Sequence, residues 1–238
     1  MKNKVVYIAD LDQDIDDVLA IEYLFKYDVL DYIVCDLEPN EEGKQRLNKI
    51  ILKGITCYPE IQAGTKTVFC GGALTKVAKY LEHYSLDSLV IQGGFVGSNI
   101  IKEKDQLEKF KGLEVTRTFN FNMDLAATEK VLSMDPEKVK NIILVGKNVC
   151  HSEKNTIKDI WNFEFFKKLQ EEYNIKDTKR LHDVLMCHEG LVLLNIIPDK
   201  PFCNYQQLVP MNQNDLWGAS AIISDSKRHI CTTAIEWK

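Results

Sequence analysis

Five aspartates lie between positions 10 and 17: Asp10, Asp12, Asp14, Asp16 and Asp17. They follow the apolar residues 5–9, which predict a buried strand, and they open residues 15–27, whose length and apolar character predict a buried helix. Helix N-termini favour aspartate, which accounts for one or two of the five but not for carboxylates at a strand end. Ca²⁺ and Mg²⁺ prefer oxygen donors, so the cluster favours a divalent cation site over a solvated acidic turn.

The elements around this cluster predict one α/β domain over residues 1–238, with an open, mostly parallel sheet flanked by helices. Short apolar runs alternate with stretches of helical period, which is typical of that fold class. Further strands are expected at 32–35, 88–91 and 142–145, and helices at 41–52, 74–81, 125–132, 157–173 and 183–194. Residues 219–223 and 231–237 predict a C-terminal β-hairpin. Ligands bind at the carboxyl ends of strands in such sheets, where the first aspartates lie.

The composition excludes several classes of partner. The 238 residues carry 30 basic and 35 acidic side chains, a net charge of -5, which gives no basic footprint for nucleic acid or an anionic membrane. No apolar stretch reaches membrane-spanning length. The seven cysteines show no C-x-x-C spacing, so we expect reduced thiols and a cytoplasmic location. A small-molecule substrate is therefore the expected partner, and a homo-oligomer is compatible with the sequence.

The spacing D-x-D-x-x-x-D-D from Asp10 to Asp17, followed by a small apolar helix start, resembles the N-terminal motif of the nucleoside hydrolases. These are Ca²⁺-dependent N-ribohydrolases. Five later segments resemble further motifs of that family in the same order along the chain: residues 69–75, 92–99, 119–127, 145–151 and 181–183. The chain is thus similar to a nucleoside hydrolase over most of its length, which implies the fold, the cofactor and the reaction of that family.

The resemblance also implies a role for individual residues. Asp12 would be both a Ca²⁺ ligand and the base that activates the attacking water, and His182 would lie near the leaving base. The remaining implied metal ligands are Asp17, Asp183 and the backbone carbonyl of Cys70. The implied sugar-binding residues are Asp16, Asn99, Asn120 and Thr118, the last standing where the family has a ribose-binding glutamate. Asp10 would support the cluster.

These residue types suit the implied reaction. Cleavage of an N-glycosidic bond passes through an oxocarbenium-like transition state, which a carboxylate-rich pocket stabilises. A bound cation lowers the pKa of its water, and a nearby aspartate can then take the proton. A histidine beside the leaving base can donate a proton or a hydrogen bond to it. Asparagine and carboxylate side chains form directional bonds to the ribose hydroxyls.

Two other interpretations stay open from the residues alone. One is a Mg²⁺-dependent phosphohydrolase, with Asp10 as nucleophile and Asp12 as acid or base. The other is a relative of the nucleoside hydrolases that has lost catalysis and binds a ribosylated ligand or a partner protein. His151 and His188 lie beside apolar runs, where a histidine is more often structural than catalytic.

Overall fold

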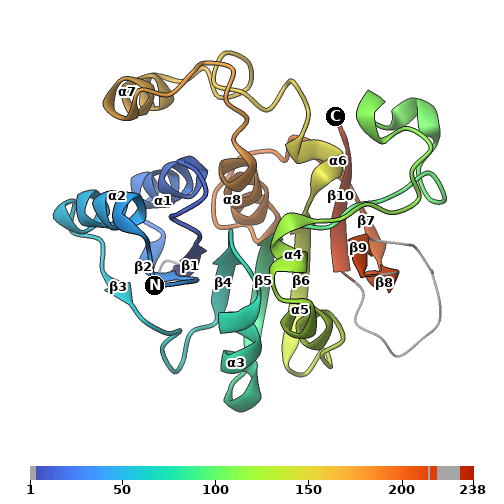
Figure 1. Cartoon of the computed structure of the whole chain (residues 1–238), viewed down its shortest axis with the longest axis horizontal. Coiled ribbons are helices and arrows are strands. Elements are labelled where there is room, and N and C mark those ends of the chain that lie inside the picture. Colours follow the sequence, from blue (N-terminus) through green and yellow to red (C-terminus); the bar gives the residue numbers. More distant parts are fainter. Residues whose placement is uncertain (1–3, 214, 219–230) are drawn as a thin grey trace.

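The computed structural model describes residues 4–213, 215–218 and 231–238, and one large sheet organises them (Figure 1). Its eight strands have the order β3-β2-β1-β4-β5-β6-β10-β7. The strands of this sheet are β1 Val5–Ala9, β2 Leu30–Cys35, β3 Cys57–Tyr58, β4 Thr67–Cys70, β5 Leu86–Gln92, β6 Val139–Val145, β7 Cys203–Leu208 and β10 Cys231–Trp237. Pairing is parallel from β3 to β10 and antiparallel only between β10 and β7. The predicted fold class is confirmed.

Helices cover both faces of the sheet, which explains why the central strand β1 is apolar and buried at all five positions (Figure 1). The helices are α1 Asp16–Lys26, α2 Glu41–Leu52, α3 Thr75–His83, α4 Phe119–Met123, α5 Leu125–Leu132, α6 Lys147–Cys150, α7 Glu164–Tyr173 and α8 His182–Leu193. Two short 3₁₀ turns, η1 Glu103–Asp105 and η2 Glu108–Phe110, precede α4. One core joins the sheet to α1 and α8, and the other joins it to α3 and α5.

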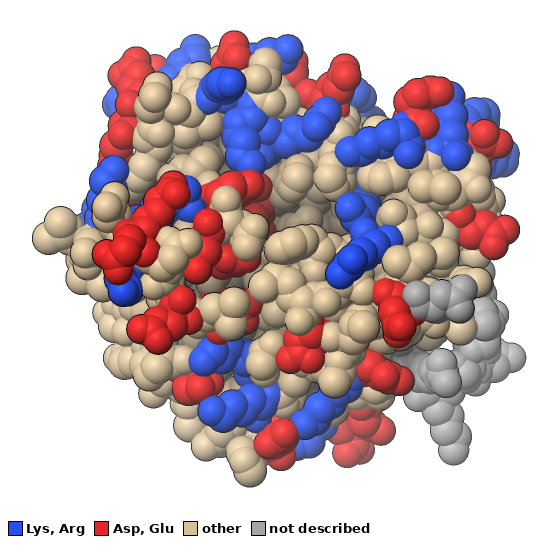
Figure 2. Space-filling view, viewed as in Figure 1, with Lys and Arg blue, Asp and Glu red and all other residues tan. Residues whose placement is uncertain are grey.

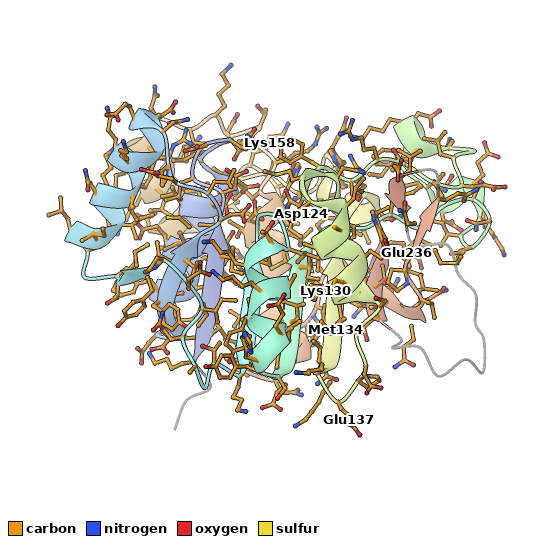
Figure 3. All side chains as sticks on the ribbon, turned by 60° about the horizontal axis from the view of Figure 1, so that its bottom comes forward. Asp124, Lys130, Met134, Glu137, Lys158 and Glu236 are labelled. Atoms are coloured by element: carbon orange, nitrogen blue, oxygen red, sulfur yellow. The ribbon has the colours of Figure 1, made fainter. Side chains whose placement is uncertain are left out.

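Local signals in the sequence set several of these boundaries. The side chain of Asn40 accepts hydrogen bonds from the backbone of Glu42 and Gly43 and so begins α2. Asp124 accepts from Ala127 N at 3.0 Å and lies at the N-terminal end of α5, as its position before an apolar stripe predicts (Figure 3). Helix α8 is buried along almost its whole length, in agreement with its apolar sequence.

Two expectations need correction or restriction. Residues 157–163 form turns around the buried Trp161, so only Glu164–Tyr173 of the predicted 157–173 helix is helical. The observed C-terminal hairpin joins β8 Met211–Gln213 to β9 Leu216–Gly218, whereas residues 219–223 fall outside the described residues.

The described helices include none that is both long enough and apolar enough to cross a membrane. The carboxyl ends of β1, β4, β5 and β6 meet at one edge of the sheet, and the N-terminal ends of α1, α4 and α8 approach the same edge (Figure 1). This edge is where the fold brings the polar residues of distant segments together.

Candidate active site

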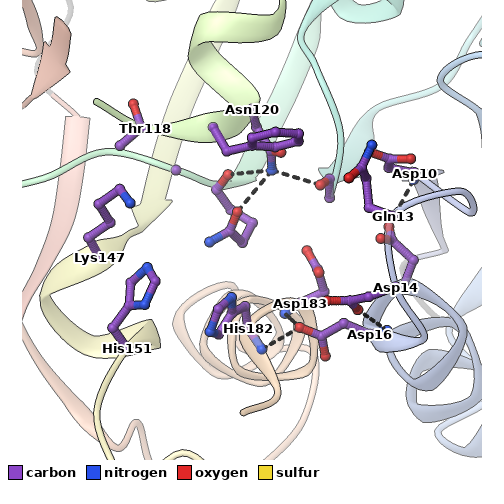
Figure 4. A pocket seen from close by; sticks show the side chains of 15 residues that line it. Asp10, Gln13, Asp14, Asp16, Thr118, Asn120, Lys147, His151, His182 and Asp183 are labelled. Carbon is purple, nitrogen blue, oxygen red and sulfur yellow. Dashed lines mark hydrogen bonds between the residues drawn. The ribbon is translucent and has the colours of Figure 1, made fainter. Parts of the chain in front are cut away.

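A cavity of about 270 Å³ opens at that edge. It collects residues from the loop after β1 and the start of α1, from the ends of β4 and β5, from α4 and α6, and from the start of α8 (Figure 4). The lining residues are Asp10, Gln13, Asp14, Asp16, Asp17, Gly71, Gln92, Gly93, Thr118, Phe119, Asn120, Lys147, His151, His182 and Asp183. The cavity is thus built from segments more than 170 residues apart, and its size suits a small ligand.

Asp16 links the start of α1 to the start of α8. Its Oδ2 accepts hydrogen bonds from the backbone of His182 at 2.6 Å and of Asp183 at 3.3 Å. These are free N–H groups at the first turn of α8, where a carboxylate is stabilised by hydrogen bonding and by the helix dipole. The contact fixes the start of α8 against the start of α1, and it presents Asp183 to the cavity.

Two further carboxylates converge at Gly71, the residue that follows β4. A Cβ atom at this position would lie 2.5 Å from Asp17 Oδ1 and 2.9 Å from Asp183 Oδ1. Residue 71 must therefore lack a side chain for both oxygens to approach the same small volume. Asp17 Oδ1 also accepts from Tyr7 Oη at 2.9 Å and from Asp10 N at 3.0 Å, so it is held firmly in place.

Burial and mutual repulsion shift the titration of these acids. Burial raises the pKa of Asp10, and burial together with the charge of Asp14 raises the pKa of Asp16 to about 7. The pKa values of Asp17 and Asp183 are raised well above the ordinary range, mainly by burial. Asp14 differs, because its hydrogen bond to Lys179 and the charge of that lysine outweigh burial and lower its pKa. Two buried oxygens, Asp16 Oδ1 and Asp183 Oδ1, have no hydrogen-bond partner among the described residues. The acidic side of the cavity is therefore costly to ionise unless a positive charge or a donor is bound there.

Asn120 closes the side of the cavity next to β4 and β5. Its Nδ2 donates to Gly71 O at 2.7 Å, to Gln92 O at 3.0 Å and to Gln92 Oε1 at 2.8 Å. Figure 4 shows this amide between the ends of the two strands. Thr118 Oγ1 donates to Trp217 O at 2.7 Å, which anchors the segment before α4 to the hairpin. Both side chains thus position the wall of the cavity.

Two histidines form the opposite side. The rings of His151 and His182 have centroids 4.9 Å apart. Burial, reinforced by neighbouring positive charge, lowers the pKa of His151 to about 3 and that of His182 to about 4. Both rings are therefore neutral at pH 7. His182 Nε2 is buried and has no hydrogen-bond partner in the part of the chain that the structure describes, so it is available to a ligand.

Seven of the residues singled out in the sequence lie in the cavity wall: Asp10, Asp16, Asp17, Thr118, Asn120, His182 and Asp183. Three do not. Asp12 Oδ1 accepts from Asn40 N at 2.9 Å and so points to the start of α2 instead of the cavity. Asn99 is exposed in the turn at 97–100. Cys70 is fully buried with its thiol directed at Gly72 O, and it is Gly71, the next residue, that reaches the cavity.

Lys147 and His151 were not assigned to the site from the sequence, although they line the cavity. Both follow the apolar residues 142–145, which the sequence identifies as a buried strand. The carboxyl ends of parallel strands share one edge of the sheet, where ligands bind. A position shortly after a predicted strand was therefore the signal in the sequence that could have assigned both residues to the site.

Comparisons with known proteins give one partial sequence relative and two solved structures of the same fold. No protein-family model matches the chain. An uncharacterized protein from Aquifex aeolicus (strain VF5) is 32% identical over 129 residues, which span 49% of this chain and 43% of that protein. The chain therefore matches less than half the length of this relative.

Two solved structures share the whole architecture. A crystal structure of an inosine-uridine preferring nucleoside hydrolase from Bacillus anthracis has a TM-score of 0.57 and 14% identity, over 98% of this chain and 94% of that one. An inosine-guanosine nucleoside hydrolase gives a TM-score of 0.56 at 14% identity, over 100% and 95% of the two chains. The fold is that of the nucleoside hydrolases.

Proposed function

We propose that the protein hydrolyses the N-glycosidic bond of a ribonucleoside or a related ribosyl compound, with Ca²⁺ as its cofactor. One observation carries the proposal: Asp10, Asp16, Asp17 and Asp183 surround a single cavity at the carboxyl edge of a nucleoside hydrolase-like sheet. An acidic cavity stabilises the positive charge that develops on ribose as the bond to the base breaks.

The chemistry of the acidic side supports a hard divalent cation. Ca²⁺ takes carboxylate and carbonyl oxygens, and the buried, unpartnered Asp16 Oδ1 and Asp183 Oδ1 are donors of that kind. Among the described residues, no group of three or more His, Cys, Asp or Glu side chains is already arranged around one point as a metal cage. Asp17 and Asp183, which converge at Gly71, are the residues that would hold the ion together with Asp10. When bound, Ca²⁺ would lower the pKa of a water molecule at the site.

The remaining residues divide the other tasks. Asp10 is the carboxylate that accepts the proton of the attacking water, because it lines the cavity and because burial raises its pKa and so makes it a stronger base. Asp16 and Asn120 bind ribose hydroxyls. His182, neutral and unpartnered at Nε2, donates a hydrogen bond to the departing base. Asp12 fixes the loop to α2 through Asn40.

The test is hydrolysis of inosine and uridine by the purified protein, followed as free base by chromatography and as ribose by reducing-sugar assay. We expect release of both products in equal amounts, loss of release with a chelator, and recovery when Ca²⁺ is added. Asp183→Asn should abolish release and leave a folded protein, as judged by circular dichroism. Lys140→Met, at the far end of β6, is the control and should retain full activity.

Other outcomes separate the alternatives. Turnover of p-nitrophenyl phosphate with Mg²⁺ and none of nucleosides would replace the proposal with a phosphohydrolase. Calcium-dependent thermal stabilisation without any turnover would indicate a binding protein.

A further inference from the structure

The two sides of the candidate site carry opposite charge. Figure 4 shows Lys147 and His151 across the cavity from Asp10, Asp14 and Asp16. On the surface, Lys and Arg atoms gather above and to the right of the central hollow, and Asp and Glu atoms lie to its left (Figure 2). The acidic side is explained by the proposed chemistry at ribose, whereas the basic side is not.

The basic side is organised around one aromatic ring. Phe110, at the end of η2, has Lys109 Nζ 4.9 Å and Lys147 Nζ 6.0 Å from its ring centroid, and the His151 ring 5.6 Å away. These contacts bring a lysine from the 103–110 segment beside a lysine from the end of β6. Burial and the positive charges of Arg180 and Lys147 lower the pKa of Lys109, in agreement with this grouping of cations.

None of these cations has a carboxylate partner within the described part of the chain. The ion pairs found there do not include Lys109, Lys147 or Arg180. Arg180 Nε is in addition buried, and no described residue forms a hydrogen bond with it. By contrast Lys179, the neighbour of Arg180, is neutralised by Asp14 at 2.7 Å. Grouped cations that lack an acid repel one another, and a bound anion would relieve that repulsion and accept hydrogen bonds from them.

We propose that the substrate is a ribosyl compound with a phosphate on its sugar, such as a nucleoside 5′-monophosphate, and that Lys147, Arg180 and Lys109 bind the phosphate. This inference rests on the proposed function, because it uses the acidic side for the ribose. A phosphate offers three acceptor oxygens and up to two negative charges, which matches several converging cations. A neutral nucleoside would leave all of them without a counter-charge.

The reaction remains a simple hydrolysis. A water oxygen forms a bond to C1′ of the ribose and the bond from C1′ to the base nitrogen breaks. The base leaves with the electron pair of that bond and takes up a proton, and the other product is ribose 5-phosphate. The phosphate ester itself is not cleaved.

Binding and turnover can be tested separately. Titration calorimetry with Ca²⁺ present would compare inosine 5′-monophosphate, inosine, and orotidine, whose carboxylate is on the base. Since a hydrogen bond to a charged group contributes about a factor of ten to a hundred in affinity, we expect inosine 5′-monophosphate to bind about ten to a hundred times more tightly than inosine. Lys147→Met and Arg180→Met should each remove most of this difference, measured as the ratio of the two affinities within the same variant. Lys140→Met removes an exposed lysine at the opposite end of β6 and should leave the preference intact.

The outcomes distinguish this inference from the proposed function. Equal binding of inosine and its monophosphate, with hydrolysis of inosine, would overturn the phosphate site and leave the hydrolase proposal standing. Tighter binding of orotidine than of inosine 5′-monophosphate would overturn it as well, since the anion would then belong to the base. A phosphate preference that depends on Lys147, without release of ribose 5-phosphate, would support the phosphate site and contradict the hydrolase proposal.

Discussion

The hydroxyl of Tyr7 donates a hydrogen bond of 2.9 Å to Asp17 Oδ1 in the interior of the protein. Tyr7 comes from the middle of β1, in a strand whose five residues are all buried, and its ring carries a donor to the edge of the sheet. The same oxygen accepts from Asp10 N. A residue of the hydrophobic core thus helps to satisfy a carboxylate of the candidate site.

Tyr7→Phe should therefore destabilise the protein. Asp17 would lose one of two donors to a buried oxygen, which costs about 1–3 kcal/mol of unfolding free energy at neutral pH. Urea denaturation followed by tryptophan fluorescence measures the change. Tyr80→Phe is the control, because the Tyr80 hydroxyl donates only to the Thr65 carbonyl, away from the site. A smaller loss for Tyr7→Phe than for Tyr80→Phe would contradict the role given to the Tyr7 hydroxyl.

Gly71→Ala should disrupt the convergence of Asp17 and Asp183. The added methyl group would meet both oxygens at distances that no Cβ atom tolerates, so at least one carboxylate must move. We expect a loss of about 1–3 kcal/mol in stability from overpacking, and a loss of Ca²⁺-dependent thermal stabilisation.

The control for this substitution is Gly218→Ala, in which the new methyl group would lie 3.5 Å from its nearest neighbours. It should retain the response to Ca²⁺. An unchanged response in Gly71→Ala would show that the two carboxylates do not act at a common point.

Asp10→Asn and Asp12→Asn should differ sharply in activity. Asp10 lines the cavity, so replacement of its carboxylate should lower kcat for base release by about a hundredfold or more. Asp12→Asn keeps an oxygen that can accept from Asn40 N, so kcat should change by less than about tenfold. Steady-state kinetics on both variants measures the two values of kcat. The opposite result would return the role of base to Asp12, as the family resemblance implies.

The stability of the protein should depend on the charge of Glu189, a fully buried residue of α8. Its carboxylate accepts from Phe202 N at 2.6 Å and from the Tyr205 hydroxyl. Burial raises its pKa from 4.5 to about 7. The folded state therefore holds the proton more tightly than the unfolded state. The resulting stabilisation is fully present below pH 4.5 and is lost as the pH rises through about 7.

Glu189→Gln should remove this part of the pH dependence, which is on the order of 3 kcal/mol between pH 4.5 and 8. Unfolding free energies of both proteins at several pH values give the difference. Asp16 and Asp36 shift the wild-type profile in the same direction, so only the wild-type minus variant difference reports on Glu189. Parallel profiles for the two proteins would rule out a titrating Glu189.

Much of the fold could be predicted because its signals are local. The apolar strand β1, the aspartates behind it and the largely apolar α8 are each evident within a dozen residues. The short β4 has only four residues, and β7 has two consecutive exposed glutamines, so neither has a periodicity that a sequence reveals. The order of strands, which brings β6 close to β4 and β5, depends on long-range packing.

The candidate site was predictable to the same degree. Asp16, Asp17 and Asp183 could be found because each begins a recognisable helix. The direction of the Asp12 side chain could not, because it depends on a backbone N–H at Asn40 that only the folded loop supplies. Lys147 and His151 joined the site through the neighbouring positions of β5 and β6 in the sheet.

The position of β10 between β6 and β7 has a consequence for the order in which the chain can assemble. During translation, Cys203–Leu208 leaves the ribosome before Cys231–Trp237, the strand that it pairs with in the large sheet. Strand β6 likewise pairs with β10, which is synthesised some ninety residues later. Closing such a long loop is slow, so we expect β6 and β7 to lack their common partner strand in nascent chains until late in synthesis. Until then their unpaired edges are exposed and can be bound by chaperones.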